Sequence, residues 1–426
     1  MTQISQAQTG NVTKQMKEVA KQENVDVEII RRRIASGSIV IPCNPIHNPK
    51  ALGIGKGLRV KVNANIGTSR EHCVVEEEIE KAKISIDAGA HAIMDLSTGG
   101  DLDKIRTSLL KVSPVSFGTV PIYQAGIDAI KKRGSIVDMT QDDMFHSIEH
   151  HAKQGVDFAV VHVGITKESV DRLQKQKRLI PMVSRGGSFH MAWIIHNQEE
   201  NPLYKNFDYV LEIAKEYDLT LSLGDGMRSG ALYDSNDRAK FQELLIIGEL
   251  VEQAREFGVQ TMVEGPGHMP LNDIQANIEV MKKVTKNAPY FVLGPLVTDI
   301  APGYDHFVGG IGGAFAGFFG ADFLCYLTPA EHLSLPDSQD VREGVIATRI
   351  AAHAADIARG IDRDIDKDFS MARENLDWDE MFNLCIDPEK AISYRKKRLP
   401  QEDSHVCSMC GNLCAIDLVK KYLSKK

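Results

Sequence analysis

The chain has 426 residues, 43% of them hydrophobic and 25% charged, with a formal net charge of −8. This composition is ordinary for a globular chain, and the acidic balance argues against a nucleic-acid partner, since the longest basic run is Arg31-Arg32-Arg33. The first residues lack the charged and apolar regions of a signal peptide, and Cys43, Cys73, Cys325 and Cys385 are too scattered for a disulfide framework. We therefore expect a cytoplasmic protein with reduced thiols and no membrane association.

Residues 1–57 predict a small N-terminal cap. Helical patterns over residues 11–22 and 25–37 are followed by an extended, turn-rich segment over residues 39–49.

Residues 58–340 predict an α/β domain, a (β/α)8 barrel of the TIM type. Short apolar runs alternate with longer amphipathic stretches, a pattern typical of a parallel sheet covered by helices. There are nine candidate strands for eight places, so one lies outside the barrel or a boundary is wrong. The candidates span residues 59–67, 92–100, 115–125, 157–165, 180–187, 219–228, 259–268, 290–296 and 323–332.

The segment 308–327 is apolar enough to be compared with a membrane span. Its six glycines and Asp322 instead favour a small-residue helix packed closely on a core, followed by a buried strand.

Polar or glycine residues follow eight of the nine apolar runs, where a (β/α)8 barrel builds its active site. Taken singly, each has a simpler explanation, because Asn and Asp cap helices and a lone His is more often a core group. Their recurrence favours a common site. The candidates are Asn63, Asn65, Met94, Asp95, Tyr123, His162, Ser184, Arg185, Gly186, Asp225, Arg228, Glu264, His268 and His332.

These side chains predict a pocket for a polar, phosphorylated small molecule. Ser184-Arg185-Gly186-Gly187 offers donors for a phosphate or carboxylate, and Glu264 could act as a general base or accept from an amino group. Asp225 and Arg228 could contact a ring nitrogen or sugar hydroxyls. His268 and His332 follow different strands and form either a partial divalent-metal site or ordinary core or surface histidines.

Three other histidines lie close together in the sequence. His146, His150 and His151 have no acidic partner that completes a metalloprotease pattern, so we expect them on a helix surface.

Residues 341–426 predict a helical C-terminal region, with helices over 341–360, 368–384 and around 388–397. Its loop 407–414 carries Cys407, Cys410 and Cys414 in the spacing C-x2-C-x3-C. Three thiolates can hold a 4Fe–4S cluster with one iron open to S-adenosylmethionine, whereas His405 as a fourth ligand would make a zinc knuckle. Spacing alone leaves both alternatives open.

Over residues 30–415 the chain resembles the ThiC family of radical S-adenosylmethionine enzymes, which make the pyrimidine of thiamin. The resemblance is carried by VNANIGTS, MDLSTGGD, GTVPIYQA, MVSRGGS, SLGDGMR, VEGPGH, LGPLVTDIAPGYDH, TPAEHL and AAHAADIA. It implies a barrel between an N-terminal domain and a cluster-bearing tail, a homodimer, an electron donor such as flavodoxin or ferredoxin, and the substrate 5-aminoimidazole ribonucleotide.

The resemblance also implies roles for individual residues. A 4Fe–4S cluster would be held by Cys407, Cys410 and Cys414, and a divalent metal, zinc, by His268 and His332. The implied substrate contacts are Asn65, Met94, Tyr123, His162, Ser184, Arg185, Gly186, Asp225, Gly226, Met227, Arg228, Glu264 and Phe291.

Several positions depart from the usual pattern of the family. Phe291 replaces a Tyr, Val308 and Gly309 replace Thr and Ser, and Ser229 replaces a Pro, which we expect to loosen the loop carrying Arg228. The familiar cysteine spacing is also one residue longer. A scaffold kept while pocket hydroxyls are lost is typical of the paralogue BzaF, so we predict 5-hydroxybenzimidazole, for cobamide biosynthesis, as the product. The alternative is phosphomethylpyrimidine.

Two other classes of protein remain as alternatives. A zinc-dependent (β/α)8 hydrolase would need a denser set of metal ligands, such as paired histidines on one strand plus an Asp. A non-catalytic nucleotide-binding protein would not require the three clustered cysteines.

Overall fold

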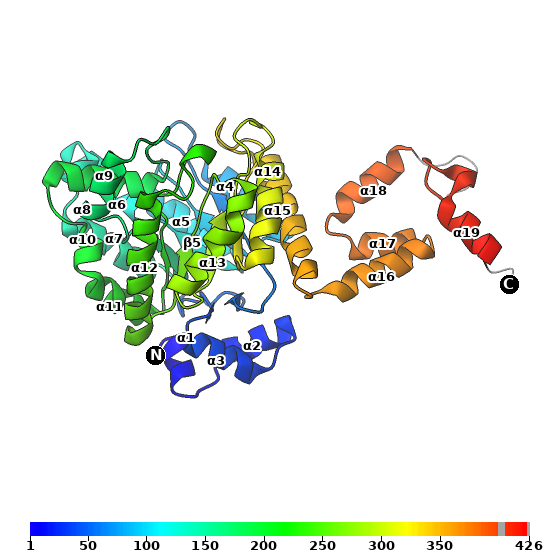
Figure 1. Ribbon diagram of the computed structural model, residues 1–426, viewed down its shortest axis with the longest axis horizontal. Helices are drawn as coiled ribbons and strands as arrows, with labels where there is room; N and C mark the ends of the chain where they lie inside the picture. Colours follow the sequence, from blue (N-terminus) through cyan, green and yellow to red (C-terminus); the bar gives the residue numbers. More distant parts are fainter. Residues whose placement is uncertain (399–404, 424–426) are drawn as a thin grey trace. The chain divides into compact units, whose positions relative to one another are not determined.

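The computed structural model describes residues 1–398 and 405–423, and the chain divides into two compact units, 1–355 and 356–426 (Figure 1). Each unit is described separately below.

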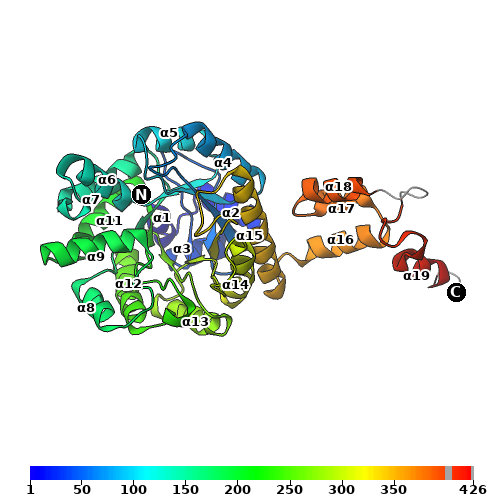
Figure 2. The same cartoon turned by 90° about the horizontal axis from the view of Figure 1, so that it is seen from above.

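The first unit contains a closed barrel of eight parallel strands, and helices surround it (Figure 2). The hydrogen-bonded order is β10-β3-β4-β5-β6-β7-β8-β9. The predicted (β/α)8 fold is therefore confirmed. The strands are β3 Lys61–Ile66, β4 Ala92–Asp95, β5 Ser116–Thr119, β6 Phe158–Val161, β7 Thr220–Leu223, β8 Thr261–Glu264, β9 Tyr290–Leu293 and β10 Phe323–Cys325.

The barrel helices form where amphipathic stretches follow the strands. They are α4 Val75–Asp87, α5 Leu102–Val112, α6 Pro121–Arg133, α7 Gln141–Lys153, α8 Lys167–Lys175, α9 Arg185–Asn197, α10 Pro202–Lys205, α11 Phe207–Tyr217, α12 Arg238–Phe257, α13 Ile274–Val284, α14 Asp305–Phe319 and α15 Ser338–Ala358. Short 3₁₀ turns occupy 136–138, 232–234 and 271–273.

The ninth candidate strand, 180–187, lies outside the barrel. Its first half is irregular and its second half begins α9, because Ser184 caps that helix by accepting a hydrogen bond from Gly187 N at 3.1 Å. Pro181 also lacks the N–H that a central strand would need.

The glycine-rich segment forms α14 and then the buried strand β10, as predicted. A side chain at Gly312 would collide with the carbonyl oxygen of Pro295, so the glycine lets the helix approach the β9–α14 loop closely. None of the helices in the described ranges is long and apolar enough to cross a membrane.

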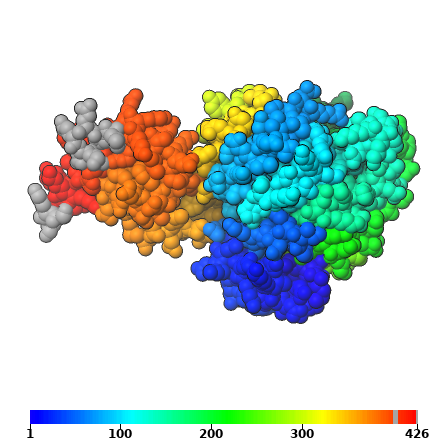
Figure 3. Space-filling model, turned by 180° about the vertical axis from the view of Figure 1, so that it is seen from behind, coloured from blue at the N-terminus to red at the C-terminus, as the bar shows by residue number. Residues whose placement is uncertain are grey.

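An N-terminal layer packs against one end of the first unit, where it is drawn in dark blue (Figure 3). It consists of α1 Gln3–Gln8, α2 Lys14–Glu23, α3 Val27–Ala35 and the antiparallel pair β1 Ile39–Val40 and β2 Ile54–Gly55. Thr2 Oγ1 donates to Gly258 O at 2.6 Å, and Gln260 exchanges side-chain hydrogen bonds with the backbone of Ile41. Because Gly258 and Gln260 lie just before β8, this layer covers the end of the barrel opposite the strand carboxyl ends.

One histidine predicted on a helix surface is buried instead. His151 in α7 is 3% exposed, and its ring nitrogens meet Thr119 Oγ1 at 2.8 Å and Arg106 Nη1 at 2.7 Å. The prediction was wrong for this residue because its partners come from β5 and α5, far away in the sequence.

The second unit consists of helices α16 Arg363–Glu374, α17 Trp378–Leu384, α18 Pro388–Lys397 and α19 Ala415–Leu423, with a 3₁₀ turn at 411–413. The prediction of a single helix over 368–384 is wrong. It breaks at Leu376, which has a positive φ of 53°, and Asp377 then caps α17 by accepting from Glu380 N at 3.1 Å.

Candidate active site at the carboxyl ends of the barrel strands

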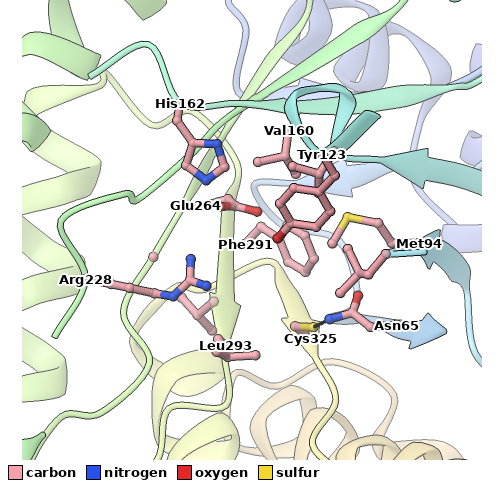
Figure 4. Close-up of a pocket in the computed structure, with 14 residues that line it drawn as sticks. Asn65, Met94, Tyr123, Val160, His162, Arg228, Glu264, Phe291, Leu293 and Cys325 are labelled. Atoms are coloured by element: carbon pink, nitrogen blue, oxygen red, sulfur yellow. Dashed lines mark hydrogen bonds between the residues drawn. The ribbon is translucent and has the colours of Figure 1, made fainter. Parts of the chain in front are cut away.

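A cavity opens at the carboxyl ends of the strands (Figure 4). Seven of the thirteen predicted substrate contacts line it, and they come from seven different strands or the segments that follow them. The structure therefore brings these seven residues together around one cavity. The cavity is lined by Asn65, Met94, Leu96, Val120, Tyr123, Val160, His162, Arg228, Glu264, Gly265, Phe291, Val292, Leu293 and Cys325.

Glu264, the last residue of β8, is the acidic group of this cavity. Burial raises its pKa to about 7, against the opposing effects of the Arg228 guanidinium and of the Asp225 N–H. A carboxyl group that titrates near neutrality can accept or donate a proton at physiological pH. Glu264 is therefore suited to general acid–base work on a bound ligand.

His162 follows β6 and is fully enclosed. Burial, with His190 and Arg228 nearby, holds its pKa well below the usual range, so the imidazole is neutral. Its Nε2 lies 3.1 Å from Ser184 Oγ, while its Nδ1 has no hydrogen-bond partner among the described residues. A neutral ring with an unpaired buried nitrogen suits a polar ligand.

Ser184 and Gly186 support His162 without lining the cavity. A side chain at Gly186 would collide with the His162 ring, so only glycine permits this packing at the start of α9. The guanidinium of Arg185 lies 5.1 Å from the centre of the Tyr123 ring.

Arg185 lines a second hollow that also contains Asn65 and Leu293 of the first, together with His332. The two hollows are therefore contiguous. Arg185 and the amino end of α9 together provide positive charge and backbone donors, which suit an anionic group such as a phosphate.

The loop after β7 is arranged differently from the prediction. Met227 is buried in the core, and the carboxylate of Asp225 lies 3.6 Å from Lys240 Nζ, so neither side chain lines the cavity. Arg228 does line it, and its Nε is buried without a hydrogen-bond partner within the described ranges.

Ser229, which we predicted to loosen this loop, is hydrogen-bonded to the loop after β8. Its hydroxyl donates to the carbonyl oxygen of His268 at 2.8 Å, so a side-chain hydrogen bond replaces the ring of the expected proline as a restraint.

Cys325 is a cavity residue that the strand-end pattern missed. It ends β10, its Sγ lies 2.9 Å from Asn65 Nδ2, and burial raises its pKa to about 12, so the thiol is protonated. The pattern counted polar residues, and a cysteine at the end of an apolar run looked like part of the core.

His268 and His332 come together as predicted, with ring centres 5.4 Å apart. Nδ1 of His268 is 2.7 Å from Asp299, and Nδ1 of His332 is 3.5 Å from Asp305. Carboxylates behind Nδ1 orient a histidine to bind a metal through Nε2. In the described parts of the chain, however, no group of three His, Cys, Asp or Glu residues is placed to hold a metal ion.

The three clustered cysteines lie in the second unit. The N–H groups of Cys410 and Met409 lower the pKa of Cys407, and the neighbouring Cys407 sulfur raises the pKa of Cys410. Cys414 packs in an apolar cluster with Leu376. A loop whose N–H groups stabilise a thiolate has the donor chemistry that an iron–sulfur cluster needs.

The profile of the radical SAM ThiC family matches residues 2–421. The chain belongs to this family. A protein of Caldanaerobacter subterraneus subsp. tengcongensis is 58% identical over 99% of this chain and 98% of its own length. Proteins of Moorella thermoacetica (55% identical; 100% and 99%) and Methanocaldococcus jannaschii (54%; 99% and 99%) are similar over their full lengths. All three are named phosphomethylpyrimidine synthase.

Family membership identifies an enzyme that uses radical S-adenosylmethionine chemistry, and with it S-adenosylmethionine and an iron–sulfur cluster as cofactors. The predicted product, 5-hydroxybenzimidazole, is overturned by these full-length relatives, whose name matches the alternative.

The structure explains why the departures from the family pattern misled the prediction. Val308 packs with Leu296 and Leu327, and a side chain at Gly309 would point at Leu327, so neither position faces the cavity. Among the four departures, only Phe291 lines the cavity wall, where it stacks on Phe323 with ring centres 4.3 Å apart.

Proposed function

We propose that this protein is a phosphomethylpyrimidine synthase of thiamin biosynthesis that acts on 5-aminoimidazole ribonucleotide. The observation that supports this most strongly is the cavity that joins Glu264, Arg228 and a neutral His162 and continues into the hollow beside Arg185. Full-length relatives that carry the synthase name agree with it.

The cavity suggests a division of roles. The aminoimidazole lies among Asn65, Tyr123, His162 and Glu264, where Glu264 accepts from the amino group or moves a proton. The phosphate lies toward Arg185 and the amino end of α9. Met94 and Phe291 form the apolar wall, and Arg228 lies on the aminoimidazole side. The remaining predicted contacts act through the loops that hold these groups; they are Ser184, Gly186, Asp225, Gly226 and Met227.

The cluster ligands in this proposal are Cys407, Cys410 and Cys414. When bound, a 4Fe–4S cluster supplies the electron that cleaves S-adenosylmethionine to the 5′-deoxyadenosyl radical. The chain's own contribution is a loop that stabilises thiolates, and we propose flavodoxin or ferredoxin as the electron donor.

An anaerobic turnover tests the function. Reconstituted protein is incubated with aminoimidazole ribonucleotide, S-adenosylmethionine and a reductant, either dithionite or reduced flavodoxin, and products are identified by mass. We expect phosphomethylpyrimidine as the main product with either reductant. Dominant hydroxybenzimidazole, or no consumption of the ribonucleotide, would contradict the proposal.

We propose a divalent metal, zinc, at His268 and His332. Removing both imidazoles in the His268→Ala, His332→Ala double variant is expected to release the non-iron metal, because the carboxylates of Asp299 and Asp305 cannot hold it alone. Elemental analysis measures it, with iron content as the internal reference. The His196→Ala variant is the control, since His196 is exposed on α9. Equal zinc in the double variant and the control would rule the site out.

We also propose a homodimer. The face of α14 and the residue before it expose a row of large apolar side chains, an unusual feature for a surface that only meets water. Sedimentation at micromolar concentration distinguishes a dimer from a monomer. The row consists of Tyr304, Phe307, Ile311, Phe315 and Phe318.

A further inference from the structure

Two charged residues of α12, Lys240 and Glu243, are buried behind the loop that follows β7. Lys240 is 3% exposed and Glu243 is 1% exposed, although α12 lies on the outside of the barrel. Burying a charged group is costly unless it is paired and hydrogen-bonded. None of the roles proposed above uses either side chain.

Glu243 binds the backbone of the loop through both carboxyl oxygens. Its Oε1 accepts from Gly226 N at 2.9 Å, and its Oε2 accepts from Met227 N at 2.7 Å. A side chain at Gly226 would crowd Ile165 and approach Glu243, so the loop backbone lies directly against the carboxyl group. Two successive N–H groups on one carboxyl fix the peptide between Asp225 and Arg228.

A buried ion pair lies beside Glu243. Lys240 Nζ lies 3.6 Å from the Asp225 carboxylate, one turn of α12 before Glu243. Burial and the negative charge of Asp225 raise the pKa of Glu243 well above the usual range.

The opposite side of the loop is restrained as well. Arg178 Nη2 donates to Met227 O at 2.8 Å, and Arg178 is itself held by Asp237 through bonds of 2.6 and 2.7 Å. Both backbone polar groups of Met227 are therefore hydrogen-bonded to buried side chains, Glu243 on one side and Arg178 on the other, although the Met227 side chain itself lies in the core.

This loop matters for the cavity at two points. Arg228, the next residue after Met227, lines the cavity, and the Asp225 N–H stabilises the ionised form of Glu264. A shift of the loop by a fraction of an ångström therefore displaces the cavity's guanidinium and changes the environment of its acidic group.

We propose that Glu243 is a positioning residue that holds the loop 225–228 so that Arg228 meets the phosphorylated substrate, while Lys240 pairs with Asp225 at the start of the same loop. This inference rests on the proposed function, since it assigns Arg228 to the same ligand. Glu243 acts from outside the cavity, through the backbone of Gly226 and Met227, and contacts no reacting atom.

The test compares Glu243→Gln with Glu249→Gln, a matched change at an exposed position of the same helix. The side-chain amide of the Gln can accept a hydrogen bond from one of the two backbone N–H groups, those of Gly226 and Met227, but its NH2 group faces the other and repels it. Substrate affinity, measured by calorimetry on the reconstituted holoenzyme with aminoimidazole ribonucleotide, is expected to fall about ten- to a hundredfold. KM should rise by a similar factor with a much smaller change in kcat, as expected for lost binding rather than lost chemistry. Glu249→Gln should match the wild type.

Hydrogen exchange measures the loop directly. In Glu243→Gln, the amides of Gly226 and Met227 should exchange faster while the barrel strands keep their protection. If that variant does not fold, Glu243→Asp replaces it, because its shorter side chain cannot reach both amides and should weaken binding in the same direction. Unchanged substrate affinity and unchanged loop exchange in the folded variant would overturn the inference. Failure of the wild type to bind the ribonucleotide would overturn the proposed function instead.

Discussion

A Cys410→Ala variant is expected to lose S-adenosylmethionine cleavage entirely. Three thiolates are the minimum that holds a cluster with one open iron, so removing any one leaves too few ligands. The barrel should remain folded, because Cys410 belongs to the second unit and is exposed there. Iron content and 5′-deoxyadenosine formation, measured anaerobically after reconstitution, should both fall to background.

Cys385→Ala is the matched control for this experiment. Cys385 is a half-buried cysteine of the same unit, outside the loop 407–414, and its removal should leave iron content and cleavage unchanged. A Cys410→Ala protein that still forms 5′-deoxyadenosine would refute the assignment of the cluster ligands.

A Glu264→Gln variant is expected to lower turnover by about a hundredfold or more, because general acid–base catalysis contributes about 10² to 10⁴ in rate. The amide keeps the size of the side chain and can still accept from the Asp225 N–H, but it cannot take up a proton. The measurement is single-turnover formation of pyrimidine, with Glu249→Gln as the control. Turnover within about twofold of the wild type would exclude a proton-transfer role.

The same variant should change how stability depends on pH. The pKa of Glu264 is about 7 in the folded protein and 4.5 in the reference state, so the folded protein favours the protonated form. The contribution of Glu264 to the free energy of unfolding is fully present below pH 4.5. It declines as the pH rises to about 7, a loss of about 3 kcal/mol. Glu264→Gln should therefore unfold at a higher temperature than the wild type at pH 8, with a smaller difference at pH 5.

Thermal unfolding at the two pH values separates this effect from the rest of the protein. Asp218, whose pKa is also raised to about 7 by burial, is present in both proteins and cancels in the comparison. An equal difference at pH 5 and pH 8 would show that Glu264 is not held in its protonated form.

The barrel was predictable because its signals are local. Strand and helix periods alternate, and strand ends carry polar residues, so neither feature needs knowledge of distant contacts. The prediction of a strand over 180–187 was wrong for a local reason too. Ser184 follows an apolar run, as the residues after the true strands do, but it caps helix α9. The buried His151 could not be predicted, because its burial depends on Arg106 and Thr119, which lie more than thirty residues away.

The residues that line the cavity were predictable from the sequence, but those that support them from behind were not. Asn65, His162, Arg228 and Glu264 lie near or after the ends of strands and line the cavity, whereas Glu243 lies in a helix whose charges resemble a solvated face. The product was mispredicted because the sequence shows that a hydroxyl group is missing at a position but not whether that position faces the cavity. Val308 is next to a motif in the sequence but faces Leu327 in the fold.

The N-terminal layer affects how substrate, products and water can reach the cavity. Thr2, Ile41 and their neighbours cover the amino ends of the strands, and hydrogen bonds to Gly258 and Gln260 fix them there. Substrate, products and bulk water therefore enter and leave through the same opening of the cavity, at the carboxyl ends of the strands. A reactive carbon radical is protected when water and stray hydrogen donors are kept out. Because the N-terminal layer already covers the amino ends of the strands, one movable segment over the opening at the carboxyl ends is enough to isolate the reaction from water.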